Sequence, residues 1–167
     1  MSKKFKKNLD IYFNESKDIS NKPTKKYNYL IFDEKTRNNF ITNGYSIIRL
    51  NNNNKKEREK LEVVKQYGLN NDIGVVKSII NIHNKQIDNH YCVPHGLLSE
   101  TKEEQIINDD GKKYLEFNGI FFDLKKIKHI ANLIGGDCGI LTSENEYELI
   151  CLSGKKGYAY LLGCRTY

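Results

Sequence analysis

The sequence predicts an α+β fold, with a mixed or antiparallel sheet, two to four helices and a C-terminal β-α-β-β-β unit. Three observations support this prediction. Short runs rich in Tyr, Ile, Phe and Val, typical of strands, end at turn signals such as Asn-Gly. Charged segments with apolar residues at helical spacing lie between these runs. The 167 residues have the length of one domain, so we expect a single hydrophobic core.

Residues 1–26 are rich in Lys, Asn and Ser. We expect them to form a basic, flexible tail ahead of a single α+β domain over residues 27–167. Several apolar residues interrupt the tail, and docking through a short amphipathic turn is the alternative. These residues are Leu9, Ile11, Tyr12, Phe13 and Ile19.

The domain begins with a predicted strand over residues 27–32, which combine Tyr, Leu, Ile and Phe. Asp33 suits the N-cap of a short helix that ends at Asn43-Gly44, because glycine readily adopts the left-handed conformation of a helix end. A second strand is predicted over residues 45–50.

A charged helix is predicted over residues 55–67, after a loop of four asparagines, and Gly68 ends it. The pattern leaves open whether residues 72–95 form a helix, a strand or a metal-bound loop. Residues 83–113 are the least regular part of the chain, and Asn108-Asp109-Asp110-Gly111 indicates a turn there.

The C-terminal third has the clearest pattern. A strand is predicted over residues 114–122, followed by a helix that Asp123 caps and Gly135-Gly136 end. This helix has an apolar arc and an opposite polar arc. The apolar arc holds Leu124, Ile127, Ile130, Ala131 and Ile134, and the polar arc holds Lys125, Lys126, Lys128 and His129.

Three further strands are predicted over residues 138–143, 147–153 and 158–165. The sequence Gly154-Lys155-Lys156-Gly157 separates the last two strands and indicates a hairpin turn. These elements complete the predicted β-α-β-β-β unit.

The segment from Leu115 to Tyr167 resembles the final segment of bacterial DNA-polymerase sliding clamps. The matching pieces are Phe117-Asn118-Gly119 with Phe121-Phe122-Asp123, the helix end Gly135-Gly136, and the terminus Leu161-Leu162-Gly163-Cys164-Arg165-Thr166-Tyr167. The resemblance implies a βαβββ clamp-type module whose helix presents Lys125, Lys126 and Lys128 to DNA. It also implies a partner-peptide groove near Leu162, Cys164 and Arg165. The chain differs from clamps in its basic charge and in Gly163, where the family carries a proline.

The net charge of +6 and the isoelectric point near 9.0 fit an anionic partner such as nucleic acid. Codon bias is the alternative explanation, because Asn, Lys, Ile and Tyr are all frequent. The candidate nucleic-acid contacts are Lys125, Lys126 and Lys128 on the helix and Lys155 and Lys156 in the hairpin turn.

The location that we expect is cytoplasmic, without membrane contact. No window approaches the roughly 20 apolar residues of a membrane span, and the first residues do not form a signal peptide. The four cysteines are widely spaced and are expected to be free thiols.

Three histidines and one cysteine lie close together in sequence: His83, His90, Cys92 and His95. Imidazole and thiolate are the ligands that zinc prefers, so this group is a candidate zinc site. Its spacing differs from the established zinc motifs. The interpretation that we favour is a strand at Tyr91-Cys92-Val93 with solvated histidines beside it.

A cysteine enzyme is another hypothesis, because Asp137-Cys138-Gly139 is similar to the nucleophile region of ubiquitin-like-protein proteases. His95 or His129 would be the base. The residues after Cys138 are predicted to form a strand, which removes the helix N-terminus that lowers the thiol pKa in such enzymes.

Three function classes follow. The first is a non-enzymatic binding module that acts on nucleic acid or on a nucleic-acid-handling protein. The second is a small protein-interaction or inhibitory factor of a mobile element, for example against a host defence enzyme. The third is a Cys/His-dependent hydrolase or a zinc-stabilised domain. The first class needs no cofactor.

Overall fold

The computed structural model has an α+β fold, as predicted. It describes residues 3–15, 20, 26–34, 37–50, 54–70, 91–92, 106–109, 111–117, 120–136, 139–142, 149–155 and 157–163. The helices in these ranges are α1 (Lys3–Asn14), α2 (Lys55–Lys65) and α5 (Leu124–Ile134). The strands are β1 (Tyr29–Asp33), β2 (Asn38–Thr42), β3 (Ser46–Leu50), β4 (Tyr91–Cys92), β5 (Ile106–Asp109), β6 (Lys112–Phe117), β7 (Ile120–Asp123), β8 (Gly139–Thr142), β9 (Leu149–Gly154) and β10 (Gly157–Leu162).

The larger sheet has the strand order β1-β2-β3-β10-β9-β8-β4, and every neighbouring pair is antiparallel. The pairing of β3 with β10 joins the first strands of the chain to the C-terminal hairpin. In one row across this sheet, Ile41 pairs with Ile48, Ile48 with Ala159 and Ala159 with Leu152. All four side chains are at most 1% exposed, so this row forms the floor of the core.

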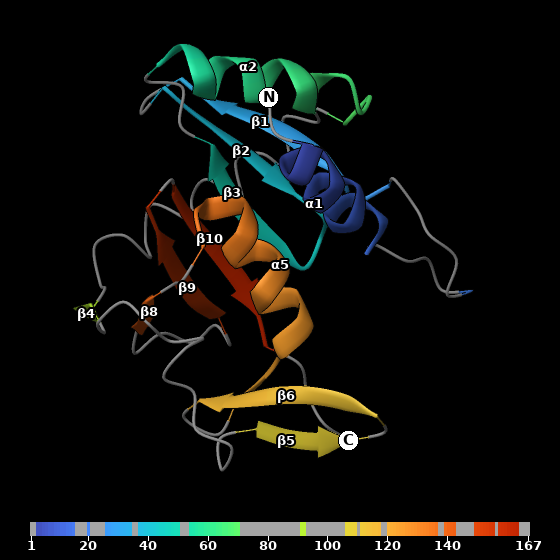
Figure 1. Cartoon of the computed structure of the whole chain (residues 1–167), viewed down its shortest axis with the longest axis vertical. Helices are drawn as coiled ribbons and strands as arrows, with labels where there is room; N and C mark the ends of the chain where they lie inside the picture. Colours follow the sequence, from blue (N-terminus) through green and yellow to red (C-terminus); the bar gives the residue numbers. More distant parts are fainter. Residues whose placement is uncertain are drawn as a thin grey trace.

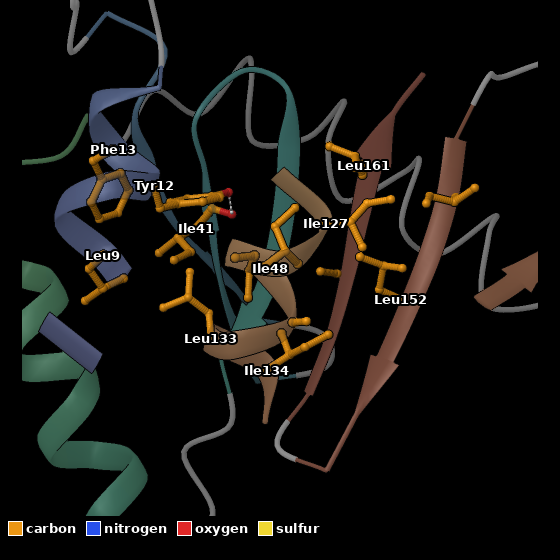
Figure 2. Packing of buried hydrophobic residues seen from close by; sticks show 14 of the residues in the cluster. Leu9, Tyr12, Phe13, Ile41, Ile48, Ile127, Leu133, Ile134, Leu152 and Leu161 are labelled. Carbon is orange, nitrogen blue, oxygen red and sulfur yellow. Dashed lines mark hydrogen bonds between the residues drawn. The ribbon is translucent and has the colours of Figure 1, made fainter. Parts of the chain in front are cut away.

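Helices α1 and α5 pack side by side on this face of the sheet, and α2 lies along the β1 side (Figure 1). Leu9 and Tyr12 of α1 and Ile127 and Ile134 of α5 are at most 1% exposed. Figure 2 shows these side chains converging on Ile48 and its neighbours from two helices that are far apart in sequence. The helices therefore hold the two ends of the chain in one core.

The smaller sheet, β5-β6-β7, lies at the N-terminal end of α5 (Figure 1). Leu115 of β6 pairs with Phe122 of β7, and both side chains are buried in the same core. This sheet thus supports the start of α5, which follows β7 directly.

The predictions for α2 and α5 and for strands β1, β3, β8, β9 and β10 are confirmed. Asp123 caps α5, and Gly135 ends it in the left-handed conformation at φ 117°. Strands β1, β3, β8, β9 and β10 lie within one or two residues of most of the predicted bounds, and β9 and β10 form the predicted hairpin. The strand predicted at Tyr91-Cys92 is present as β4, paired with β8.

The prediction of a flexible tail was wrong for residues 3–14, which form α1. Phe5, Leu9, Tyr12 and Phe13 recur at the spacing of one helix face and are buried in the core. The alternative, docking through an amphipathic segment, was closer to the observed structure.

Two further element predictions were wrong. The segment expected as a short helix after Asp33 contains strand β2, because pairing with both β1 and β3 outweighs its weak local signal. The single strand expected over 114–122 is the hairpin of β6 and β7, with Asn118-Gly119 between the strands. Residues 72–90 and 93–105 lie outside the described residues.

None of the helices that the structure describes combines the length and hydrophobicity needed to cross a membrane.

Candidate nucleic-acid interface

The first turn of α5 is held by its cap, which fixes the direction of the lysines that follow. The Asp123 carboxylate accepts hydrogen bonds from the backbone N–H groups of Lys125 (2.8 Å) and Lys126 (3.2 Å). The apolar arc of α5 is buried, so the polar arc faces outwards. Lys125 and Lys128 are exposed, as predicted for the polar arc, whereas Lys126 and His129 are partly buried.

The β2–β3 turn lies beside this part of α5. Asn43 Oδ1 accepts hydrogen bonds from the backbone N–H groups of Tyr45 and Ser46, both at 3.1 Å. Gly44 has φ 86°, and a Cβ at this position would lie 2.9 Å from the Cβ of Tyr27. The turn therefore requires glycine, and it packs directly against Tyr27.

Two exposed tyrosines on this side of the molecule each carry a lysine above the ring. Lys126 Nζ lies 4.1 Å from the ring centroid of Tyr45, and Lys26 Nζ lies 5.5 Å from that of Tyr27. Tyr45 is 38% exposed and Tyr27 is 41% exposed. We call Lys26, Tyr27, Tyr45 and Lys126 the tyrosine–lysine surface. Exposed aromatic rings beside ammonium groups can bind bases and phosphates.

A buried polar network holds the turn beneath this surface. The Tyr12 hydroxyl donates to the Ser46 carbonyl at 3.0 Å, and the Ser46 hydroxyl lies 3.1 Å from both Tyr12 Oη and Asn43 Oδ1. Burial raises the pKa of the Tyr12 phenol well above its usual value, the hydrogen bond from Ser46 opposes this rise, and the nearby Glu15 charge adds to it. The phenol therefore stays protonated and keeps donating.

Asn43 of this turn and Asn28, which precedes β1, cap the C-terminal end of α1. Asn43 Nδ2 donates to the Tyr12 carbonyl at 3.0 Å, and Asn28 Nδ2 donates to the Phe13 carbonyl at 2.9 Å. The last carbonyls of a helix have no N–H donor within the helix, and here the two buried amides supply the missing donors. The tyrosine–lysine surface is thus built on a rigid base.

His129 lies next to this network but has a structural contact. Its Nδ1 is 3.1 Å from Glu15 Oε1, and both side chains are more than four-fifths buried. Within the described residues, no thiol or hydroxyl is hydrogen-bonded to the His129 ring. The contact ties the end of α1 to α5, and the role of His129 as a catalytic base stays a prediction.

The structure does not bring Lys155 together with the lysines of α5. Lys155 lies in the β9–β10 turn, next to Gly154. A Cβ on Gly154 would lie 2.5 Å from the Ile134 carbonyl oxygen, which places this turn at the C-terminal end of α5. About 15 Å of helix therefore separates Lys155 from Lys125. Lys156 lies outside the described residues.

Most of the other predicted site residues also lie outside the described residues: His83, His90, His95, Cys138, Cys164 and Arg165. Cys92 and Leu162 are described only through the backbone of β4 and β10. In the part of the chain that the structure describes, no group of three or more His, Cys, Asp or Glu side chains could hold a metal ion. The zinc, cysteine-enzyme and partner-groove hypotheses thus stay predictions.

Sequence reasoning missed Lys26, Tyr27 and Tyr45. A signal was present, because Lys26-Tyr27 places a cation beside an aromatic ring and Asn43-Gly44-Tyr45 places another ring in a turn. Their meeting with Lys126 depends on the packing of α5 beside the β2–β3 turn.

No protein-family model, curated protein or solved structure matches this chain.

Proposed function

We propose that this chain is a non-enzymatic binding module for nucleic acid and that its tyrosine–lysine surface contacts single strands. The observation that carries the proposal is the exposed ring of Tyr45, held on a hydrogen-bonded turn with Lys126 Nζ at 4.1 Å. A base stacks on such a ring, and a lysine beside it neutralises the neighbouring phosphate.

A stacked base is expected to bind the Tyr45 ring more strongly than the Lys126 ammonium does. A cation above an exposed aromatic ring contributes roughly 0.5–1 kcal/mol, whereas a stacked base contributes roughly 1–3 kcal/mol. A base therefore displaces the Lys126 ammonium from Tyr45. The long lysine side chain then reaches the phosphate, so the exchange keeps the favourable charge interaction.

The exposed side chains of α5 next to the tyrosine–lysine surface are also positively charged. Lys125 and Lys128 are exposed on the same half of α5, and α5 contains no acidic residue. Glu15, the carboxylate that contacts this helix at His129, is mostly buried. These features support binding to phosphates that is independent of base sequence and decreases with salt.

The test is a titration of a fluorescent single strand of about 15 nucleotides, followed by anisotropy. We expect Tyr45→Ala to weaken binding by about 10-fold or more, because it removes one stacking platform. We expect Lys126→Gln to weaken binding to all sequences and to lower the slope of log K against log salt by about 1. A duplex of the same sequence should bind less tightly, because its bases are not available for stacking.

Matched controls come from other faces of the molecule. Tyr158 is 40% exposed and has Arg49 5.8 Å from its ring centroid, so Tyr158→Ala removes a similar pair on β10. Lys65→Gln removes an exposed lysine of α2 that pairs with Glu62. Equal losses from Tyr45→Ala and Tyr158→Ala would refute the assignment of this surface. A partner recovered from lysate that survives both nuclease and high salt would instead favour a protein-interaction factor.

A further inference from the structure

The β2–β3 turn contains the dipeptide Asn43-Gly44, which has a chemistry of its own. The backbone nitrogen of a glycine can attack the side-chain carbon Cγ of a preceding asparagine, and glycine hinders this approach least because it has no side chain. The fold requires both residues here. Asn43 is 0% exposed and bonds the end of α1, and a Cβ on Gly44 would lie 2.9 Å from the Cβ of Tyr27. A reactive dipeptide is therefore built into a buried turn.

The folded turn engages both reacting groups in other hydrogen bonds. Asn43 Nδ2 donates to the Tyr12 carbonyl at 3.0 Å, and Asn43 Oδ1 accepts from two backbone N–H groups of the same turn, both at 3.1 Å. The Gly44 N–H donates to Thr42 Oγ1 at 3.1 Å. Attack on Cγ requires the asparagine side chain to rotate and the glycine N–H to be released. The reaction therefore requires the turn to open locally.

We propose that Asn43 is a deamidation site, which the buried polar network protects and which local opening of the β2–β3 turn makes reactive. In the opened turn, the Gly44 nitrogen bonds to Asn43 Cγ and loses its proton. The Cγ–Nδ2 bond breaks, and Nδ2 leaves as ammonia with that proton. Water then opens the resulting cyclic imide at one of its two carbonyl carbons and leaves aspartate or isoaspartate at position 43.

Neither product fits the folded turn. The carboxylate oxygen that replaces Nδ2 cannot donate to the Tyr12 carbonyl, and it would lie near Glu15 Oε2, which is 3.4 Å from Nδ2. Two carboxylates at this distance repel each other. Isoaspartate adds a carbon atom to the backbone of a turn that already packs against Tyr27. Because ammonia is lost, the modification permanently marks chains whose turn has opened. The site does not depend on the nucleic-acid proposal.

The first test follows deamidation of the full chain at mildly alkaline pH by peptide mass spectrometry, in buffer and in urea. Asn118-Gly119 is the internal reference, because it is the same dipeptide in the same chain. In urea, the two asparagines should react at similar rates. In buffer, Asn43 should react at least about 10-fold more slowly than in urea, because only the opened fraction reacts.

The second test weakens the turn without touching the dipeptide. Thr42→Val removes the acceptor of the Gly44 N–H, and Tyr12→Phe removes a hydroxyl partner of Ser46. Each variant should raise the rate at position 43 in buffer by about 3–10-fold, because each loses about one hydrogen bond of the turn.

Two further variants complete the comparison. Lys65→Gln changes an exposed side chain of α2 and should deamidate at the wild-type rate. Asn43→Asp imitates one product and should lower the melting temperature by roughly 2–4 °C or more, because the buried donor to the Tyr12 carbonyl is lost.

Three results would overturn the proposal: equal rates at Asn43 in buffer and in urea, a rate in buffer that neither Thr42→Val nor Tyr12→Phe raises, or an unchanged melting temperature in Asn43→Asp. If Tyr12→Phe does not fold, the comparison of Thr42→Val with Lys65→Gln decides alone.

Discussion

The two ends of the α1–α5 helix pair differ in how their buried polar groups are satisfied. At the C-terminal end of α1, Tyr12, Asn43 and Ser46 are bonded to one another and to the backbone. At its N-terminal end, Asn8 is also buried and lines a cavity between the ends of α1, α2 and α5, and its Nδ2 has no hydrogen-bond partner among the described residues. We call the end with Tyr12, Asn43 and Ser46 the closed junction, because its polar groups are paired, and the end with Asn8 the open junction.

The difference shows that the two ends of one helix can differ in how much their buried polar groups contribute to stability. A neutral buried hydrogen bond contributes about 1 kcal/mol, whereas an unpaired buried donor costs about 1–3 kcal/mol. The closed junction stabilises the fold and holds the β2–β3 turn. The open junction lowers stability, because it keeps a buried donor without an acceptor among the described residues.

The largest expected effect comes from Leu9, which lies between the two junctions and is fully buried. Leu9→Ala should lower the free energy of unfolding by about 2–5 kcal/mol, because it leaves a cavity in the shared core. Urea denaturation measures this loss. The control, Ile11→Ala on the partly exposed side of α1, should cost about 1 kcal/mol or less. Similar losses in the two variants would mean that α1 does not pack as described.

The next effect comes from the closed junction itself. Tyr12→Phe should lower the free energy of unfolding by about 1–3 kcal/mol, because the buried Ser46 carbonyl loses its shorter hydrogen bond and the Ser46 hydroxyl loses an acceptor. The wild type should also lose stability above about pH 10, since the unfolded phenol ionises there while burial raises the pKa of the folded one.

The stability contributed by this phenol is complete below about pH 10 and decreases as the pH rises further. Urea denaturation at several alkaline pH values should show a steeper loss for the wild type than for Tyr12→Phe. Parallel curves for the two proteins would exclude a buried, protonated Tyr12.

The smallest expected effect comes from the partly buried contact of Glu15 with His129, 3.1 Å apart. Glu15→Gln should cost about 0.5–1 kcal/mol, because glutamine keeps the shape and can still accept a hydrogen bond. Its control is Glu62→Gln, which removes an exposed pair with Lys65 and should cost less than about 0.5 kcal/mol. A loss larger than that of Tyr12→Phe would mean that the Glu15–His129 contact, and not the phenol, holds the closed junction.

The sequence predicted α5 well because its signals are local. Asp123, the apolar arc and Gly135 all lie within the helix or next to it, and each agrees with the others. Strand β2 was missed because its identity comes from pairing with β1 and β3, and its Asn38-Asn39 start has low strand propensity. The helical spacing of Phe5, Leu9 and Tyr12 was present in the sequence, but the surrounding lysines and asparagines concealed it.

The candidate sites were less predictable than the fold. Lys125, Lys126 and Lys128 were identified from the polar arc of one helix. Their partner Tyr45 comes from a turn about 80 residues earlier, which only the packed structure places beside them. The cavity at Asn8 is built from the ends of three helices, and no local pattern encodes such a meeting.

The position of α1 in the sequence affects how the chain folds during its synthesis. Its core residues Leu9 and Tyr12 leave the ribosome first, but their partner α5 ends only at Ile134. At about 5–20 residues per second, translation separates the two helices by roughly 6–24 s. During that time the apolar stripe of α1 lacks the part of its native cover that α5 supplies. Chaperones that bind exposed apolar segments can therefore act on α1 until α5 emerges.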